Sequence, residues 1–151
     1  MKSELSRHVF SSHKNATCYS LRIFHFVECM CLRNEQLSGS LLFSISQLNL
    51  KWPRVSNNNF KGSLPECLFH VKSITLMKLD NNQFTGSLLN SNTKLSKLIL
   101  FRATSKKLTG AIYARIKHAS QLKYLSLYIN LTHGTIPEFV FNLTALEEGR
   151  L

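Results

Sequence analysis

Hydrophobic residues recur in short groups with a fixed internal spacing along the second half of the chain. Each group places apolar residues at positions one, four and six, and successive groups keep a constant period (98 − 74 = 122 − 98 = 24): Ile74, Met77, Leu79; Leu98, Phe101, Ala103; Leu122, Leu125, Leu127. The last two residues of a group alternate with polar ones, which predicts a short strand with both of them facing a core. A single coil cannot bury such a face alone, so the pattern predicts several coils stacked on one another.

The glycines follow the same period. Five of the six glycines lie on it, with the first interval shorter by a single position: Gly39, Gly62, Gly86, Gly110 and Gly134. Glycine tolerates tight bends that other residues avoid, so each one marks a bend of its coil. A branched aliphatic residue follows two positions later in every case: Leu41, Leu64, Leu88, Ile112 and Ile136. We expect these residues to return the chain to the core.

An asparagine stands four positions before the glycine in three coils, at Asn58, Asn82 and Asn130. This is where the chain turns out of the predicted strand and leaves backbone groups without partners. A buried amide can both donate and accept hydrogen bonds. The three asparagines are therefore predicted to form a structural ladder from coil to coil.

The pattern N-x-L-x-G-x-I-P, repeated with this period, resembles the plant-specific leucine-rich repeat of receptor-like kinases, receptor-like proteins and polygalacturonase inhibitors. The best matching stretches are 82–88 and 58–65, and Leu64-Pro65-Glu66-Cys67-Leu68 is similar to a phrase of receptor-like proteins. The resemblance implies an α/β leucine-rich-repeat solenoid of about four to five repeats. Its short parallel β-sheet would line the concave face, and its convex side would be irregular or 3-10 helical. It also implies a non-enzymatic recognition module for a protein or peptide in defence or developmental signalling, with a co-receptor as a further partner.

The resemblance covers residues 34–151, which we predict to be the repeat domain. Residues 1–33 lack the repeat, and their cysteine spacing does not match the family's capping region, so we predict a degenerate, poorly ordered leader. We expect neither end of the solenoid to be capped, as in a truncated fragment of a receptor. Pro53 occupies a strand leucine position, where it lacks the N–H for a ladder hydrogen bond, so the first repeat should pair imperfectly.

The outward positions of the predicted strands form a candidate binding face. The position between the two strand leucines gives Arg54, Lys78, Arg102 and Ser126, and the position two residues earlier gives Trp52, Leu76, Leu100 and Tyr124. Of these we select a ligand-binding set: Trp52, Arg54, Lys78, Arg102, Tyr124 and Ser126. Three stacked cations would favour an acidic partner.

The net charge is +11, from 19 Lys and Arg against 8 Asp and Glu. Residues 51–123 contain 13 basic and two acidic residues, so their charge of 13 − 2 = +11 accounts for all of the excess. This balance leaves three functions open. The chain is a recognition module that binds a peptide, a glycan or a partner receptor, a binder of nucleic acid or anionic surfaces, or a remnant without activity. We favour a protein or peptide ligand over nucleic acid.

No catalytic, metal or cofactor motif accompanies the repeat. The cysteines Cys18, Cys29, Cys31 and Cys67 form no C-x-x-C pair, and a disulfide from Cys18 to Cys29 or Cys31 stays open. The adjacent carboxylates Glu147 and Glu148 are expected at a ragged end without a pocket. We therefore predict no enzyme, no metal and no cofactor.

Localisation rests on the resemblance, which implies the plasma membrane or the cell exterior. The most apolar early stretch, 19–32, is interrupted by Arg22, His25 and Glu28, which does not fit a signal peptide. No transmembrane segment is visible, so a cytoplasmic location also stays open. Of the three N-x-[ST] sequons, at Asn15, Asn130 and Asn142, the last is the best glycosylation acceptor, because Asn130 is predicted to be a buried ladder residue.

Overall fold

The computed structural model of the chain describes residues 29–33, 36–41, 50–87, 95–104, 107–110, 116–128, 130–132 and 138–151. Every structural statement below concerns these residues. Predictions made for Cys18, Gly134, Leu88, Ile112 and Ile136 lie outside them.

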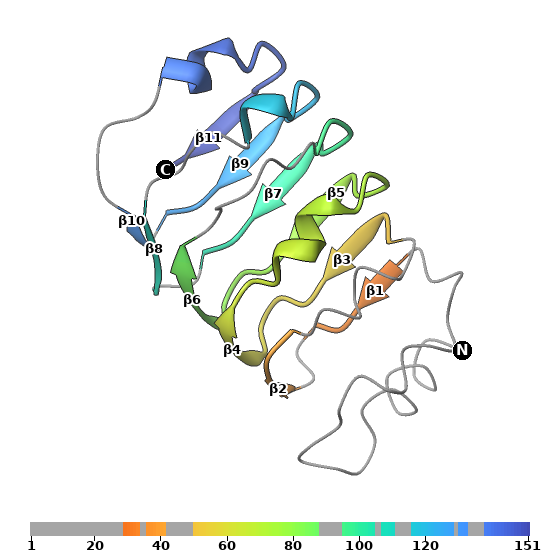
Figure 1. Cartoon of the computed structure of the whole chain (residues 1–151), viewed down its shortest axis with the longest axis vertical. Helices are drawn as coiled ribbons and strands as arrows, with labels where there is room; N and C mark the ends of the chain where they lie inside the picture. The colour runs from red at the N-terminus through yellow and green to blue at the C-terminus, as the bar shows by residue number, and fades with distance from the viewer. Residues whose placement is uncertain are drawn as a thin grey trace.

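A six-stranded parallel sheet runs the length of the molecule (Figure 1). Its order is β1-β3-β5-β7-β9-β11, so each coil adds one strand beside the previous one. The strands are β1 (Cys29–Cys31), β3 (Trp52–Arg54), β5 (Leu76–Lys78), β7 (Leu100–Arg102), β9 (Tyr124–Ser126) and β11 (Glu148–Arg150). The central residue of each of the first five strands is buried: Met30, Pro53, Met77, Phe101 and Leu125. The residues on either side of it therefore point to the opposite, concave face.

A second parallel sheet of five strands borders the first, with the order β10-β8-β6-β4-β2. Its strands are β2 (Ser38–Gly39), β4 (Asn59–Ser63), β6 (Gln83–Ser87), β8 (Leu108–Gly110) and β10 (Leu131–Thr132). The sequence pattern did not predict this sheet. Gly39, Gly62 and Gly86 lie within β2, β4 and β6. Their φ angles of +102°, +78° and +83° are in the left-handed region, which glycine adopts readily, so the predicted bends lie inside this sheet.

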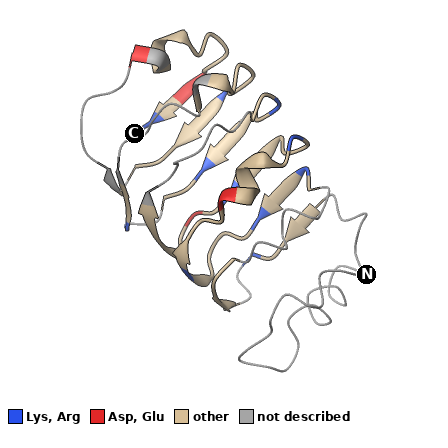
Figure 2. Ribbon diagram, viewed as in Figure 1, with Lys and Arg blue, Asp and Glu red and all other residues tan. Residues whose placement is uncertain are grey.

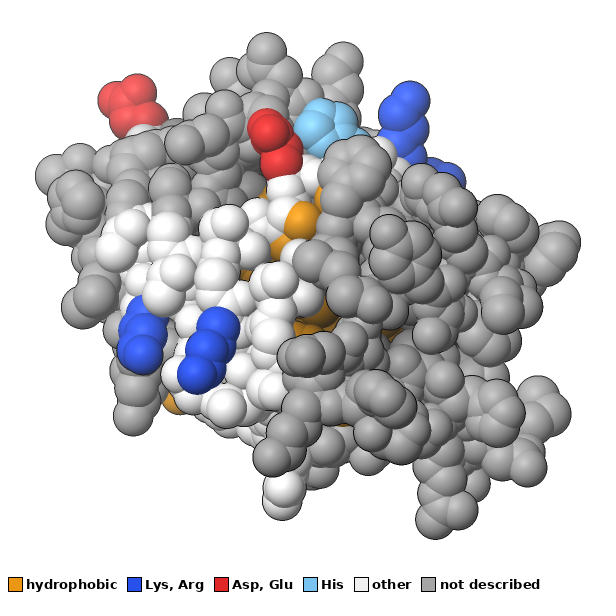
Figure 3. All heavy atoms as spheres, turned by 60° about the horizontal axis from the view of Figure 1, so that its bottom comes forward, with side chains coloured by type: hydrophobic (Ala, Val, Ile, Leu, Met, Phe, Trp, Pro, Cys, Tyr) orange, Lys and Arg blue, Asp and Glu red, His pale blue; other side chains and the backbone are white. Residues whose placement is uncertain are grey.

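The convex side carries short 3-10 helices, as expected. These are η3 (Glu66–His70), η4 (Ile116–His118) and η5 (Glu138–Asn142), and the described residues contain no α-helix. Figure 3 brings the second-sheet side forward. Hydrophobic side chains show there only in small patches, so the described part of this side offers no broad apolar surface.

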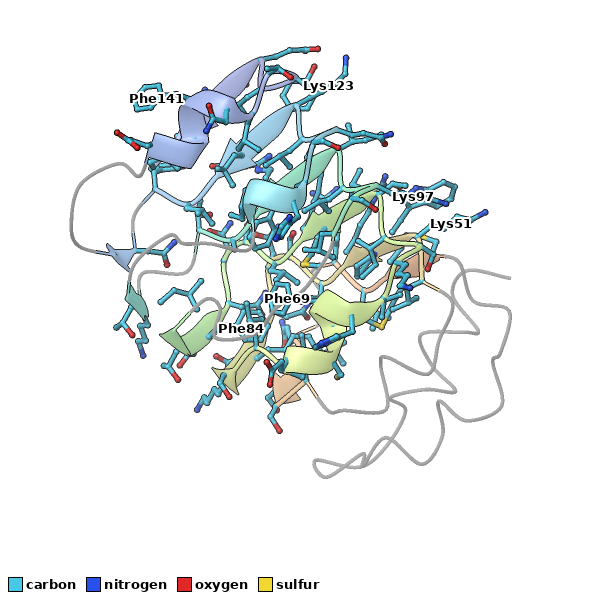
Figure 4. All side chains as sticks on the ribbon, turned by 45° about the horizontal axis from the view of Figure 1, so that its top comes forward. Lys51, Phe69, Phe84, Lys97, Lys123 and Phe141 are labelled. Carbon is cyan, nitrogen blue, oxygen red and sulfur yellow. A yellow bond between two sulfur atoms is a disulfide. The ribbon has the colours of Figure 1, made fainter. Side chains whose placement is uncertain are left out.

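The core lies between the two sheets and the 3-10 helices. All nine repeat hydrophobics, from Ile74 to Leu127, are buried. Aromatic rings join neighbouring coils: Phe60 stacks on Phe84 with ring centroids 6.2 Å apart, and Phe69 meets Phe101 edge-on at 6.5 Å. Phe69 and Phe84 point into this interior in Figure 4. The predicted stacked solenoid is confirmed.

The sheet starts earlier than the predicted repeat domain. Strand β1 pairs with β3 through Cys29↔Trp52 and Cys31↔Arg54, so it lies before residue 34. Met30 and Leu32 are buried at the spacing of a strand pair, and this was a signal that the sequence offered. The sheet therefore includes residues 29–31, which precede the predicted boundary at residue 34, and residues 1–28 lie outside the described part of the chain.

Pro53 lies in the buried strand position that the sequence assigned to it. Strands β5 and β7 are paired at three residues, whereas β3 and β5 are paired only at Arg54↔Lys78. The proline nitrogen has no hydrogen to donate, which accounts for the shorter ladder. The first repeat pairs imperfectly, as expected.

The three repeat asparagines donate side-chain hydrogen bonds to backbone carbonyls of their own coil and of the preceding one. The Nδ2 of Asn82 donates to Val55 O at 2.9 Å and to Leu79 O at 3.1 Å. The Nδ2 of Asn130 donates to Ala103 O at 2.8 Å. Asn58 reaches Leu32 and Val55 in the same way. These bonds fix the spacing of adjacent coils.

Candidate functional site

The concave face presents the predicted cations as one column. The register pairs Arg54 with Lys78, Lys78 with Arg102, and Arg102 with Ser126. Adjacent members are therefore about 5 Å apart in the hydrogen-bonding direction. Blue segments recur on successive strands of this sheet in Figure 2. The column continues one strand further, because Ser126 pairs with Arg150. Arg150 was missed, although extending the period by one more coil would have found it.

The neighbouring column is partly apolar. Leu76 pairs with Leu100 and Leu100 with Tyr124, while Trp52 stands on β3 beside Cys29. Trp52 is 39% exposed and Tyr124 37%, so both rings are accessible to a ligand. The column ends on Glu148, which pairs with Tyr124.

The cations of the column are poorly compensated. The Nε of Arg54 is buried and has no hydrogen-bond partner. Among the described residues, no other buried side-chain nitrogen or oxygen atom lacks one. Partial burial of Lys78 lowers the pKa of its amine, and the nearby charges of Arg54, Arg102 and Arg33 lower it further. Asp80 acts in the opposite direction. The column therefore holds positive charge at a cost in free energy.

Asp80 is a residue whose role the sequence reasoning did not identify. It is buried, with 6% of its surface exposed. Its carboxylate accepts hydrogen bonds from Ser56 Oγ at 3.4 Å and Thr104 Oγ1 at 3.3 Å, and lies 3.5 Å from Arg102 Nε. Ser56, Asp80 and Thr104 occupy the same position in successive coils, so the period of the repeat was an available signal. This cluster holds Arg102 at the concave face.

A pocket of about 270 Å³ opens at the β7–β9–β11 end of the concave face. Its lining includes Arg102, Ser126 and Tyr124, joined by three further polar residues: Tyr128, Glu148 and Arg150. Glu148 was predicted to lie at an end without a pocket, and that prediction is wrong, because β11 completes a sixth strand beside β9. Ser126, predicted as a ligand contact, is only 9% exposed and forms the floor.

Tyr124 and Lys123 share one hydrogen-bond acceptor, Glu147. The Tyr124 hydroxyl donates to Glu147 Oε2 at 2.7 Å, and Lys123 Nζ donates to Glu147 Oε1 at 2.6 Å. The hydrogen bond to the Glu147 carboxylate raises the pKa of the Tyr124 phenol and also that of Lys123. The same two hydrogen bonds, first that from Lys123, lower the pKa of Glu147. Figure 4 shows Lys123 projecting outward, as do Lys51 and Lys97.

The remaining predicted sites lie away from this face. Asn142 is exposed at the end of η5, whereas Asn130 is half-buried by its ladder bonds. Cys29 and Cys31 form a disulfide within β1, a pairing that the open alternatives did not include. Cys67 is a buried free thiol. Phe141, also on η5, is 77% exposed (Figure 4).

Among the residues that the structure describes, no three His, Cys, Asp or Glu side chains are grouped so as to hold a metal ion. No helix in that part of the chain is long and apolar enough to cross a membrane.

Comparison with known proteins finds no matching family model and no significant match among curated proteins. Solved structures match most of the chain. The ectodomain of the receptor kinase GASSHO1/SCHENGEN3 from Arabidopsis thaliana, in complex with CASPARIAN STRIP INTEGRITY FACTOR 2, is 30% identical with a TM-score of 0.80. That match covers 87% of this chain and 16% of the receptor chain. This chain is a plant-type leucine-rich-repeat solenoid.

Two further receptor ectodomains, both from Arabidopsis, resemble this leucine-rich-repeat solenoid. HAESA, in complex with an IDA peptide hormone lengthened at its N-terminus, is 26% identical with a TM-score of 0.77, covering 89% of this chain and 23% of HAESA. SOBIR1 is 27% identical with a TM-score of 0.72, covering 80% of this chain and 65% of SOBIR1. The solenoid thus spans 16% of the GASSHO1/SCHENGEN3 ectodomain and less than a quarter of the HAESA ectodomain.

Proposed function

We propose that this solenoid is a recognition module that binds an extended protein or peptide ligand on its concave face, and that the bound ligand is acidic. The proposal involves no catalytic step. Support comes from the solved neighbours, two of which are described as complexes with a peptide hormone or an integrity factor. Extracellular exposure and a second receptor ectodomain as co-receptor belong to the same proposal.

The observation that carries the proposal is the register of the cation column. Arg54, Lys78 and Arg102 stand side by side on three adjacent strands, and the Asp80 carboxylate lies 3.5 Å from Arg102 Nε. Like charges at this separation destabilise the protein slightly when exposed to water. An acidic ligand would relieve that repulsion. The free protein is therefore electrostatically matched to a negative partner.

An extended peptide suits the face better than a compact ligand does. Neighbouring cations of the column are about 5 Å apart. Successive residues of an extended peptide advance about 3.4 Å, so the side chains on one side of the peptide recur every ~7 Å. Long Glu side chains can bridge that difference. The exposed rings of Trp52 and Tyr124 lie beside the column and offer apolar contacts near its two ends.

The test is selection of short peptides from a random library on the purified chain, followed by calorimetry. We expect the selected peptides to be acidic. Lys78→Gln should weaken their binding about tenfold and reduce its salt dependence by about one charge. The matched control is Lys97→Gln, since Lys97 is an exposed lysine in the turn before β7. It should change the affinity less than twofold.

Selection of neutral or basic peptides would contradict the proposal, as would equal losses in the two variants. A single-stranded oligonucleotide provides the other arm. If it binds as tightly as the peptides, regardless of base sequence and with a steep loss of affinity in salt, then the chain binds anionic surfaces in general.

The predicted glycosylation of Asn142 has its own test. Asn142 is exposed and followed by a Leu-Thr pair, which completes a sequon. Directed through the secretory pathway of a eukaryotic host with an added signal peptide, the chain should gain an N-glycan that Asn142→Gln abolishes. A glycan on Asn130 instead would contradict the ladder, because its amide nitrogen donates to Ala103 O.

A further inference from the structure

The first sheet has an open edge at β11 in the described part of the chain. Strand β11 is the last in the order of that sheet and is paired with β9 alone. Figure 1 shows it at the end of the sheet opposite β1. The second sheet ends at β10, which follows β9 along the chain, so β11 lies one strand beyond it. Another strand can therefore approach β11 without meeting a strand of the second sheet.

The ladder to β9 determines which backbone groups of β11 face the open edge. Glu148 N–H donates to Lys123 O at 3.0 Å, and Arg150 O accepts from Leu127 N–H at 2.7 Å. Both residues therefore direct these groups toward β9. Because successive residues of a strand direct their N–H and C=O to opposite sides, those of Gly149 point to the open edge.

Two more groups face the same edge by the repeat. Lys123 O and Leu127 N–H both bond to the strand that follows their own. Glu147 and Leu151 occupy the same two positions one period later (147 − 123 = 151 − 127 = 24). The Glu147 O and the Leu151 N–H therefore point to the open edge with Gly149. Such a row of backbone groups is a template for pairing with another strand.

The charges of β11 are complementary to a second copy of β11 in the antiparallel direction. If Gly149 of one copy lies opposite Gly149 of the other, Glu148 of each copy lies opposite Arg150 of the other (148 + 150 = 149 + 149). Both side chains are exposed and line the same pocket, so they share the concave face. Opposite charges in directly opposed positions stabilise a strand pair, whereas like charges destabilise it.

The same register satisfies the open backbone groups. Gly149 N–H of each copy donates to Gly149 O of the other, which makes this a hydrogen-bonded pair of the antiparallel ladder. Leu151 N–H of each copy then reaches Glu147 O of the other (151 + 147 = 149 + 149). Glu148 and Arg150 form the non-hydrogen-bonded pairs, in which opposed Cα atoms are only about 4.5 Å apart. The side-chain charges therefore meet closely.

A head-to-tail arrangement of copies suits the edge less well. In that arrangement β11 would continue the parallel sheet beside β1 of the next copy, with Glu148 beside Cys29 and Arg150 beside Cys31. Those two cysteines form a disulfide and carry no charge. Antiparallel pairing instead uses both charges, and it closes after two copies because each copy contributes the same patch.

We propose that β11 is a self-association edge, through which two copies of this chain pair antiparallel about a two-fold axis at Gly149. The six strands of each copy then form one continuous sheet, with both concave faces on the same side. A contact of one strand edge is small, so the dissociation constant should be on the order of 0.1 mM. The pairing goes beyond the proposed recognition function and requires no ligand.

The experiment is sedimentation equilibrium of the whole chain from about 0.01 to 1 mM, at an ionic strength of ~0.15 M. We expect a monomer–dimer equilibrium. Glu148→Arg and Arg150→Glu each place like charges opposite one another, so each should raise the dissociation constant at least tenfold. Net charge alone gives the opposite sign for Arg150→Glu, which lowers the charge of each copy from +11 to 11 − 2 = +9. The control Lys97→Glu makes the same charge change in an exposed turn and should not raise the constant more than twofold.

An equimolar mixture of the two single variants is the strictest test of the register. One variant has two basic residues on the strand and the other has two acidic ones, so an antiparallel pair of the two regains opposite charges at both positions. We expect this mixture to associate at least as tightly as the unmodified chain. The double variant Glu148→Arg/Arg150→Glu exchanges the charges within one strand and should dimerise within about threefold of the unmodified chain.

Amide hydrogen exchange locates the contact. Exchange of Gly149 N–H should slow as the protein concentration rises, whereas that of Glu148 N–H, which already donates to Lys123 O, should change little. A chain that stays monomeric up to about 1 mM, or oligomers larger than a dimer, would overturn the proposal. A mixture no tighter than its separate components would also overturn it. Unchanged melting temperatures of the single variants in dilute solution would assign their losses to association, and recovery in the mixture would show the same for a variant that melts earlier.

Discussion

Asn82 offers the sharpest test of what holds the coils together. Its side chain is 7% exposed and connects two coils. Its Nδ2 donates to Val55 O and Leu79 O, and its Oδ1 accepts from Phe60 N at 3.1 Å. Asn82→Ala removes these partners at once. Val55 O keeps its hydrogen bond from Asn58 Nδ2, whereas Leu79 O and Phe60 N are left without water to replace the amide.

The expected cost follows from the two groups that lose their partner, Leu79 O and Phe60 N. A buried polar group left without a partner costs about 1–3 kcal/mol, so the loss in the free energy of unfolding should be about 2–6 kcal/mol. Because a domain of this size is stable by about 5–15 kcal/mol, the variant should be marginally folded.

Urea unfolding monitored by far-UV circular dichroism measures the change, with the fluorescence of Trp52, the only tryptophan, as a second probe. The matched control is Gln83→Ala, which removes the adjacent amide and its exposed bond to Asn59. The control should lose less than about 0.5 kcal/mol. If Asn82→Ala loses less than about 1 kcal/mol, or no more than the control, then the ladder does not hold the coils together.

Three further predictions use the same structure. The pKa of Lys78 is lowered, so the folded chain binds this proton more weakly than the unfolded chain does. The free energy of unfolding should therefore rise with pH in the alkaline range just below 10.5. Lys78→Gln should remove that rise, measured by urea titrations at several pH values. The raised pKa of Tyr124 gives the opposite sign: its contribution to stability is complete below 10.0 and is lost as the pH rises through the folded-state value. Glu147→Gln should bring the Tyr124 pKa, measured by NMR of the labelled ring, back toward 10.0, and an unchanged value would refute the hydrogen bond to Glu147 as its cause. Gly86→Ala should lower the free energy of unfolding by about 1–2 kcal/mol, because Gly86 has a φ of +83°. The control is Gly149→Ala, whose added methyl group meets only an ordinary contact at 3.5 Å; thermal unfolding should show a change within about 0.5 kcal/mol.

The periodic positions explain why most of the fold was predictable. Once Met77, Phe101 and Leu125 are aligned on the repeat period, their burial and the outward direction of Lys78 and Arg102 follow from the alternation of a strand. The same alignment places the cation column in register without any knowledge of the structure.

The second sheet was missed because its pairing is a property of the backbone. In β4 the residues on either side of buried Phe60 are exposed, and Gly62 has no side chain to contribute a hydrophobic pattern. Pairing there depends on the position of the preceding coil, which local sequence does not encode. The pocket was missed for another reason: Arg150 contributes to it only when β11 lies beside β9.

The two parallel sheets have a consequence for the thermodynamics of recognition. Each coil is hydrogen-bonded to its neighbours along two edges, and the asparagine amides fix the interval between coils. Such a surface is preorganised, so the entropy of ordering on association falls mainly on the ligand. Ligands of equal charge should then differ in affinity according to their own stiffness, and a cyclised or proline-stiffened acidic peptide should bind more tightly than its flexible counterpart.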